Sequence, residues 1–393
     1  MASDYSSRYA LIYSLVLIAL CILFIFIIVD PLWQYLDLHI PGEPANKVDF
    51  TQLVDTAFYV RNIELGYRWG VENETSIWFH PLIIWLANII PRSVEANIRL
   101  WIVSIGAGFV SIYLLYRYIS QISPSNINPK LLILVALLPG GLGIATGNTE
   151  FLCLLFSTLL ITSVMERKHY GYQLLWGALA ILTKPNALYM AFSLFVYLVY
   201  GGINRDWKIL KSSFTGILSI IVVWILWIVF VDIKSGEVGA YWSARQIATL
   251  PLSAGPLTFL QRTARILVYA NDGGEKLKFM TALILPMMHV VLLLHIRLAS
   301  EIHRLSILVG LIGMIAIMFL TNNPNKIIVY GTTFPGFLAI GILFIKQCFQ
   351  NEIPETSEKA KVYLRYSTGI LYMIFCLEMW IFYIVGTPLG WYF

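Results

Sequence analysis

The sequence predicts an all-α polytopic membrane protein, a bundle of about 11 transmembrane helices with a cytoplasmic N-terminus. Hydrophobic residues make up 58% of the chain and charged residues only 12%, whereas soluble domains carry about 25% charged residues. Uncharged apolar runs recur along the whole length, and basic residues gather in alternate connections between them. We therefore expect one integral membrane domain over residues 1–393, with no soluble basic face for nucleic acid.

The predicted spans are apolar runs close to the roughly 18 or more residues that a spanning helix needs. They are 10–29, 100–116, 131–147, 151–165, 172–184, 186–200, 210–231, 278–296, 304–320, 328–346 and 366–386. The runs 151–165, 172–184 and 186–200 are short. The first run is longer than the h-region of a signal peptide, about 7–15 residues, and no small-x-small site follows it, so we expect a retained span.

The charges of the connections predict the topology. If Arg8 is cytoplasmic, the connections after the even-numbered spans are cytoplasmic too, and all five of them carry Lys or Arg. Two long segments, 30–99 and 232–277, then lie outside the cytoplasm, with short turns at 148–150, 184–186 and 321–327. The four cysteines, which form no CxxC or Cys/His cluster, are expected to be small apolar residues.

Three segments outside the cytoplasm predict helices along the membrane surface. In the first, Phe50, Leu53, Val54, Ala57 and Phe58 recur at the spacing of one apolar helix face. The others are "PLIIWLANII" at 81–90, which is too short to span, and "PLTFLQRTARILVY" at 256–269.

Ionisable residues on the predicted outer side are the candidates for chemistry. Asp49 is either a catalytic carboxylate or a helix cap, because Gln52 follows three residues later as in a capping box. Asn148 and Glu150 lie in "TGNTEFL", which is either a polar turn or part of a site. Lys184 in "LTKPNAL" opposes the positive-inside bias, which favours function over snorkelling.

Further candidates lie in the outer segments. They are Asp55, His80 in "WFHPL", Arg245 in "YWSARQ", and Lys326 and Tyr330 in the Asn-rich "TNNPNKIIVY". Each has a simpler interpretation as a structural histidine, an interfacial belt or a polar turn. Taken together, cations and carboxylates on one outer face suit a lipid-linked phosphate substrate, since Lys or Arg binds phosphate and a carboxylate accepts a proton from a hydroxyl.

Three motifs resemble the glycosyltransferase-C (GT-C) superfamily. They are "VDFTQLVDTAFYVRN" with the later "WFHPLII", then "GNTEFLCLLFSTLLITSVMERKHYGYQLLWGALAILTKP", then "NNPNKIIVYGTTFPGFLAIG". In this order, over about residues 50–335, they look most like the polyprenol-phosphate-sugar-dependent mannosyltransferases of glycosyltransferase family 87. Two departures are the Gly-Asn pair at 147–148, where Gly-Gln is common, and an Asn-rich late turn in place of a His-rich one.

The resemblance implies an inverting hexosyltransferase that needs no metal or other cofactor. Asp49 would be the base, with Asp30, Asp37 and Asp55 as alternatives. Lys184, together with Lys326 and Arg245, would bind the donor phosphate. The implied partners are a polyprenyl-phosphate sugar, with mannose as the expected sugar, a lipid-linked or envelope-glycan acceptor, and membrane lipids.

Other functions stay open at the level of sequence. A glycosylphosphatidylinositol-type mannosyltransferase, an enzyme for another sugar or an envelope-polysaccharide polymerase would share the architecture. A transporter or flippase is the alternative from another class, although we find no internal repeat of the kind that transporters show. The expected location is the inner membrane in a prokaryote or the endoplasmic reticulum in a eukaryote; the triplet Asn73-Glu74-Thr75 in the first outer segment does not decide between them.

Overall fold

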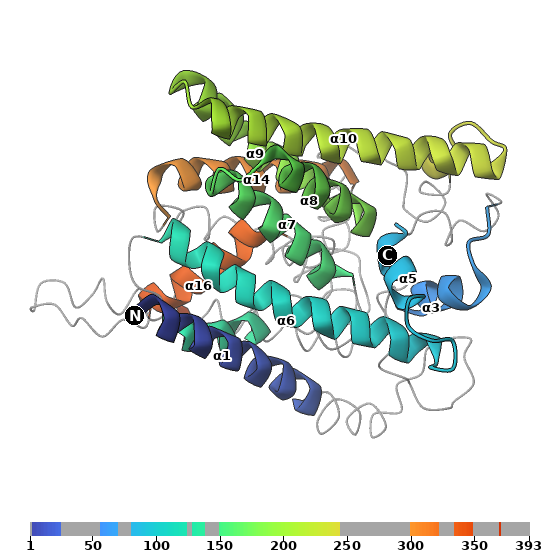
Figure 1. Ribbon diagram of the computed structural model, residues 1–393, viewed down its shortest axis with the longest axis horizontal. Coiled ribbons are helices and arrows are strands. Elements are labelled where there is room, and N and C mark those ends of the chain that lie inside the picture. Colours follow the sequence, from blue (N-terminus) through green and yellow to red (C-terminus); the bar gives the residue numbers. More distant parts are fainter. Residues whose placement is uncertain are drawn as a thin grey trace, which may run out of the picture.

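The computed structural model describes residues 2–24, 56–69, 80–123, 128–137, 149–243, 299–321, 334–348 and 369–370. Every secondary-structure element in these ranges is a helix, as Figure 1 shows. The expected all-α class is thereby confirmed for the described part of the chain. The predicted span 278–296, most of 366–386 and the surface helix at 256–269 lie outside it.

Three of the described helical segments are long and apolar enough to cross a membrane. They are α6 (Ala96–Ile122), η6 with α9 (Pro185–Ala187 and Leu188–Ile203) and α10 (Trp207–Ser235). They include the predicted spans 100–116, 186–200 and 210–231 and extend beyond each of them. The chain is thus a helical protein with candidate membrane spans, while the total of eleven spans and their topology stay predictions.

The other long elements overlap the predicted runs. They are α1 (Ala2–Phe24), α7 (Glu150–Met165), α8 (Tyr170–Thr183), α14 (Glu301–Thr321) and α16 (Pro335–Cys348). Helices α7, α8 and α14 begin and end within three residues of their runs, whereas α1 begins eight residues earlier and α16 seven residues later than predicted. One differs in type, because the run predicted as a spanning helix over 131–147 begins as a 3-10 helix, η4 (Pro129–Leu137). Two short helices, α3 (Thr56–Leu65) and α5 (Leu82–Ala87), stand where surface helices were expected.

Helices α1, α6, α7, α8 and α10 run roughly in one direction, and α16 is inclined to them (Figure 1). Helix α10 lies against α8 and α9, α9 also lies against α14, and α7 lies between α6 and α8. Small residues permit the close approaches, which is the usual device in membrane bundles. A Cβ atom built on Gly310 of α14 would lie 2.5 Å from Cζ of Phe334, and one on Gly177 of α8 would lie 3.0 Å from Cβ of Ser219 in α10.

Gly310 provides a test of this packing. Alanine favours a helix over glycine by about 1 kcal/mol, so Gly310→Ala would stabilise the protein if space allowed. We expect the reverse, a loss of about 1–3 kcal/mol, because the methyl group collides with Ser193 and Phe334. Thermal unfolding in detergent should show a lower Tm for Gly310→Ala and an unchanged or higher Tm for Gly106→Ala, whose Cβ would meet nothing within 4 Å.

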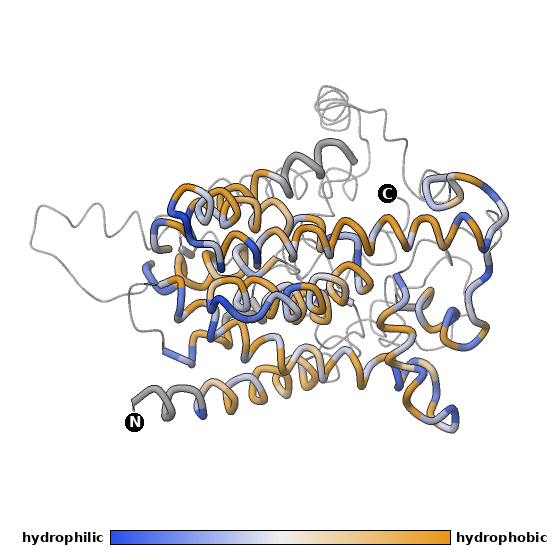
Figure 2. The backbone as a smooth tube through the Cα atoms, turned by 45° about the horizontal axis from the view of Figure 1, so that its top comes forward, coloured by the Kyte–Doolittle hydropathy of each residue, from blue (hydrophilic) through white to orange (hydrophobic). Residues whose placement is uncertain are grey.

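The two ends of the bundle are polar and the middle is apolar, as Figure 2 shows. One end joins the C-terminal ends of α6, α7 and α9 to the N-terminal ends of α8, α10 and α14; the backbone N–H of Ser300 donates to the carbonyl of Ile122 there. Basic side chains outnumber acidic ones at this end. The basic ones include Arg117, Lys130, Arg167, Lys168, Arg205, Lys208, Lys211 and Arg304, against Glu166, Asp206 and Glu301.

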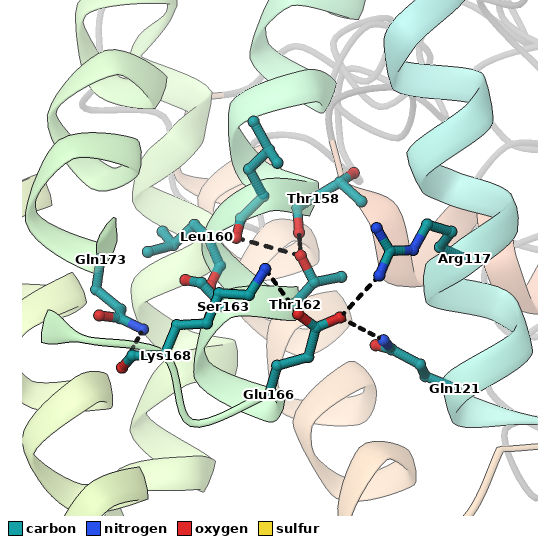
Figure 3. A network of polar contacts seen from close by, with 10 residues as sticks. Arg117, Gln121, Thr158, Leu160, Thr162, Ser163, Glu166, Lys168 and Gln173 are labelled. Atoms are coloured by element: carbon teal, nitrogen blue, oxygen red, sulfur yellow. Dashed lines mark hydrogen bonds and ion pairs between the residues drawn. The ribbon is translucent and has the colours of Figure 1, made fainter. Parts of the chain in front are cut away.

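Ion pairs hold the connections of this basic end together (Figure 3). Glu166 accepts from Arg117 at 3.3 Å, Gln121 at 2.8 Å and Lys168 at 2.8 Å, which ties α6 to the α7–α8 turn. Arg167 donates to Asp206, the N-cap of α10, at 2.8 Å. The backbone N–H of Ile209 and this guanidinium hold the pKa of Asp206 below its ordinary value.

The opposite end of the bundle carries α3 and α5 (Figure 1). Tyr59, Val60 and Ile63 of α3 are buried in one cluster with residues of α5, the first half of α6 and Leu152 of α7. Helix α3 is therefore fixed against the ends of α6 and α7. Of the predicted apolar face, Phe50, Leu53 and Val54 lie outside the described residues and Phe58 is half-buried. The buried face consists instead of Tyr59, Val60 and Ile63, and the helix ends at Leu65.

Candidate functional site

Lys184 and Glu150 lie at the ends of two neighbouring helices, on the α3–α5 side of the bundle. Lys184 caps the C-terminus of α8 in an extended conformation, φ −160° and ψ 141°, because the following Pro185 disfavours helical geometry at the residue before it. Glu150 is the first residue of α7 and not part of the preceding turn as expected. Its carboxylate is stabilised by the partial positive charge of the helix N-terminus.

These two side chains form a buried ion pair. Nζ of Lys184 donates to Oε1 of Glu150 at 2.5 Å, and the side chains are only 10% and 7% exposed. Oε2 of Glu150 is buried without a hydrogen-bond partner in the described part of the chain. A buried pair of charges is expensive to desolvate and adds little net stability compared with apolar residues of similar size, so its presence at a helix end points towards a use other than stability.

Helix α3 connects the first outer segment to this pair. Its Tyr59 is 2% exposed, and the Tyr59 hydroxyl lies 3.4 Å from Oγ1 of Thr149, the residue that precedes Glu150. Asp55 directly precedes the first residue of α3 in the sequence, and Asp49 comes six residues earlier. Both aspartates lie outside the described residues, so α3 is the nearest described part of the chain to the expected base.

His80 joins three segments a short way from Lys184. It is 1% exposed, its Nδ1 bonds to the carbonyl oxygen of Ile181 in α8, and its Nε2 lies 3.3 Å from the hydroxyl of Tyr241. In the neutral ring these partners fix the tautomer, since the carbonyl only accepts: Nδ1–H donates to Ile181 and Nε2 accepts from Tyr241. Both ring nitrogens are therefore engaged by protein groups, which favours a positioning role over substrate contact.

An aromatic cluster surrounds His80 at the end of α10. The ring of Trp227 lies 5.9 Å from the His80 ring, Trp69 lies 6.5 Å from Trp227, and Tyr67 stacks on Trp69 at 5.1 Å. Trp227 is 5% exposed and Tyr241 is fully buried. An interfacial belt was the simpler interpretation of the segment around Arg245, and the burial of Tyr241, which begins that segment, does not fit it.

The contacts of His80 lead to a prediction about stability. His80→Phe keeps a ring of similar shape but leaves the Tyr241 hydroxyl and the Ile181 carbonyl without this partner, which should lower the free energy of unfolding by about 1–3 kcal/mol. Tyr241→Phe removes only one donor and should lower it by less, about 0.5–1.5 kcal/mol. Urea or thermal unfolding in detergent measures both effects. An unchanged Tm for His80→Phe would contradict a stabilising role of the contacts that His80 makes with Ile181 and Tyr241.

The structure brings three predicted site residues, Lys184, Glu150 and His80, to one end of the bundle. The remaining candidates lie outside the described residues and stay predictions; they are Asp49, Asp55, Asn148, Arg245, Lys326 and Tyr330. The sequence interpretation missed the pairing of Lys184 with Glu150, which are 34 residues apart. A signal was present: α7 and α8 form a hairpin, so residues at equal distances from its turn, 166–169, must meet.

Among the described residues, no group of three or more His, Cys, Asp or Glu side chains is placed to hold a metal ion. The chain matches no known protein-family model, and no curated protein matches it either.

Proposed function

We propose that this chain is an inverting membrane glycosyltransferase. It would move a hexose from a polyprenyl-phosphate donor to a hydroxyl of a lipid-linked or envelope-glycan acceptor, and mannose is the hexose that we favour. The observation that carries the proposal is the buried Glu150–Lys184 pair at the end of the bundle to which α3 is fixed. The resemblance of the sequence motifs to family 87 of the GT-C superfamily adds to it.

The position of Lys184 suits a lipid phosphate. The donor keeps its isoprenoid chain in the membrane, so its phosphate must be bound where a spanning helix ends, and Lys184 lies where α8 ends. A lysine ammonium is a compact charge with three donors, suited to phosphate oxygens. Because its surroundings are largely buried, attraction to an anion is stronger than at an exposed site.

The reaction would be a single displacement. Asp49 accepts the proton of the acceptor hydroxyl, the hydroxyl oxygen forms a bond to the anomeric carbon, and the bond from that carbon to the phosphate oxygen breaks on the opposite side. The phosphate leaves with the bonding electron pair and gains one negative charge. Lys184 would therefore stabilise the transition state more than the bound donor, which accelerates the reaction.

The test is a transfer assay with the purified chain. Protein in nanodiscs is incubated with a panel of labelled polyprenyl-phosphate sugars and a membrane lipid extract, and the labelled product is identified by mass spectrometry. We expect the mannose donor to label a glycolipid or glycan with inversion at the anomeric carbon. Failure of every donor in the panel, with folded protein, would refute the transferase.

One observation also favours a transporter or flippase. A buried charged pair between helices of a membrane bundle is typical of substrate and ion pathways as well. Uptake or flipping of a lipid-linked sugar by proteoliposomes, without any covalent product, would support this second candidate. For either function we expect a multi-pass protein, in the inner membrane of a prokaryote or the endoplasmic reticulum of a eukaryote.

A further inference from the structure

We infer that Glu150 is a resident counter-ion, which occupies Lys184 in the resting protein and is displaced by the phosphate of the incoming lipid. The inference rests on the proposed function and assigns to Glu150 a role in exchange and product release. Glu150 is then a positioning residue, because it acts on the substrate through Lys184.

The first observation concerns the cation that is to bind phosphate. Oε1 of Glu150 already lies 2.5 Å from the Lys184 ammonium, and together the side chains are electrically neutral. A phosphate oxygen that approaches within hydrogen-bond distance must compete with this carboxylate oxygen. Binding of the donor is therefore an exchange of one anion for another, and not the filling of a vacant cationic site.

The second observation concerns the carboxylate that is displaced. Glu150 is 5% exposed, and its Oε2 has no hydrogen-bond partner within the described part of the chain. Glu150 also begins α7, so the helix N-terminus still stabilises the carboxylate after Lys184 has turned to the phosphate. One oxygen of Glu150 thus depends on Lys184 while the other is unsatisfied, which limits the free energy that the pair loses on exchange.

The third step concerns release of the product. The donor is a phosphodiester with one negative charge, and the leaving polyprenyl phosphate is a monoester that carries up to two. A nearby Glu150 carboxylate repels the second charge and competes again for Lys184. Glu150 would accordingly weaken donor binding and accelerate product release.

The experiment measures binding of a polyprenyl phosphate of defined length, without any sugar, to the full chain in neutral phosphatidylcholine nanodiscs. Glu150→Gln keeps the shape of the side chain and removes its charge. We expect it to bind the polyprenyl phosphate about tenfold more tightly than the unchanged chain, which corresponds to about 1.4 kcal/mol. Lys184→Gln should lose binding by a similar factor or more.

The matched control is Glu64→Gln. Glu64 belongs to α3 on the same side of the bundle but is exposed. Glu64→Gln therefore changes the net charge of the chain by the same amount as Glu150→Gln, but away from Lys184. We expect unchanged affinity for this variant. An equal gain in affinity for polyprenyl phosphate in Glu64→Gln and Glu150→Gln would show a general effect of net charge. That result would overturn the inference that phosphate displaces Glu150 from Lys184.

Kinetics separate exchange from a purely structural role. With the proposed activity, Glu150→Gln should lower both KM for the donor and kcat, since the product leaves slowly, whereas a damaged site would raise KM. Unchanged or weaker binding by folded Glu150→Gln overturns the inference. If Glu150→Gln does not fold, Glu150→Asp, which keeps the charge but retracts it from Lys184, should bind the lipid phosphate more tightly, and no gain there overturns it as well.

The outcome is distinguishable from failure of the proposed function. Loss of binding in Lys184→Gln without a gain in Glu150→Gln removes the counter-ion role alone. Normal binding by Lys184→Gln removes the phosphate site itself, and with it the observation that carries the proposed function.

Discussion

Lys184→Met is expected to lower the free energy of unfolding by about 3–5 kcal/mol, because it leaves the carboxylate of Glu150 buried and without its ammonium partner. The same variant should lose sugar transfer, because the cation that balances the leaving phosphate is absent. Chemical unfolding in detergent and the transfer assay measure the two effects separately.

A second substitution separates stability from activity. Replacing both members of the pair, Glu150→Leu with Lys184→Met, removes the uncompensated charge and should restore most or all of the lost stability. Transfer should stay absent, because no ammonium is left to bind phosphate. A double variant that is folded and active would show that the pair serves only the structure.

The pair between Arg117 and Glu166 at the basic end is the matched control. The side chains there are 48% and 25% exposed, and exposed ion pairs contribute about 0–1 kcal/mol. Arg117→Met should therefore change the free energy of unfolding by no more than about 1 kcal/mol and leave transfer intact. The contrast between the two ends tests whether burial makes the Glu150–Lys184 pair different.

Asp49→Asn is expected to reduce transfer by about 10²–10⁴-fold, the usual contribution of a general base. It should leave the protein folded, because asparagine caps a helix about as well as aspartate. A cap role and a catalytic role therefore give opposite results for this one substitution. Asp49→Ala removes both functions and should lower stability as well.

The other carboxylates of the first outer segment are the controls for Asp49. Asp30→Asn, Asp37→Asn and Asp55→Asn should each leave the rate of transfer within a few-fold of normal. Transfer by Asp49→Asn at the normal rate would exclude Asp49 as the base. Loss confined to one of the other three variants would move the role of base to that residue.

Much of the fold was accessible from hydropathy. The helical segments of α6, of η6 with α9 and of α10 contain the runs predicted for them and extend beyond both ends of each run. Hydropathy places the ends of α10 too far inwards, because charged side chains such as those of Lys208 and Lys234 lower the mean hydropathy of its first and last turns. The start of the predicted span 131–147 is a 3-10 helix, which hydropathy alone does not distinguish from an α-helix.

The site was accessible only in part. Lys184 stood out because a cation opposes the charge bias of an outer turn, and Glu150 because it lies in a polar turn between apolar runs. His80 was expected to be either structural or substrate-binding, and its partners, Ile181 and Tyr241, are 101 and 161 residues away. Contacts over such separations leave no local pattern in the sequence.

By itself the sequence determined that this chain is helical and apolar, and the approximate position of its main helices, because hydropathy and charge bias are local sums over neighbouring residues. Only the tertiary structure decided that Glu150 faces Lys184 and that His80 joins α8 to Tyr241. These pairings depend on which helices are neighbours and how each is rotated about its axis. Close contacts such as those of Gly310 and Gly177 set that rotation, and they form only when the whole bundle is packed.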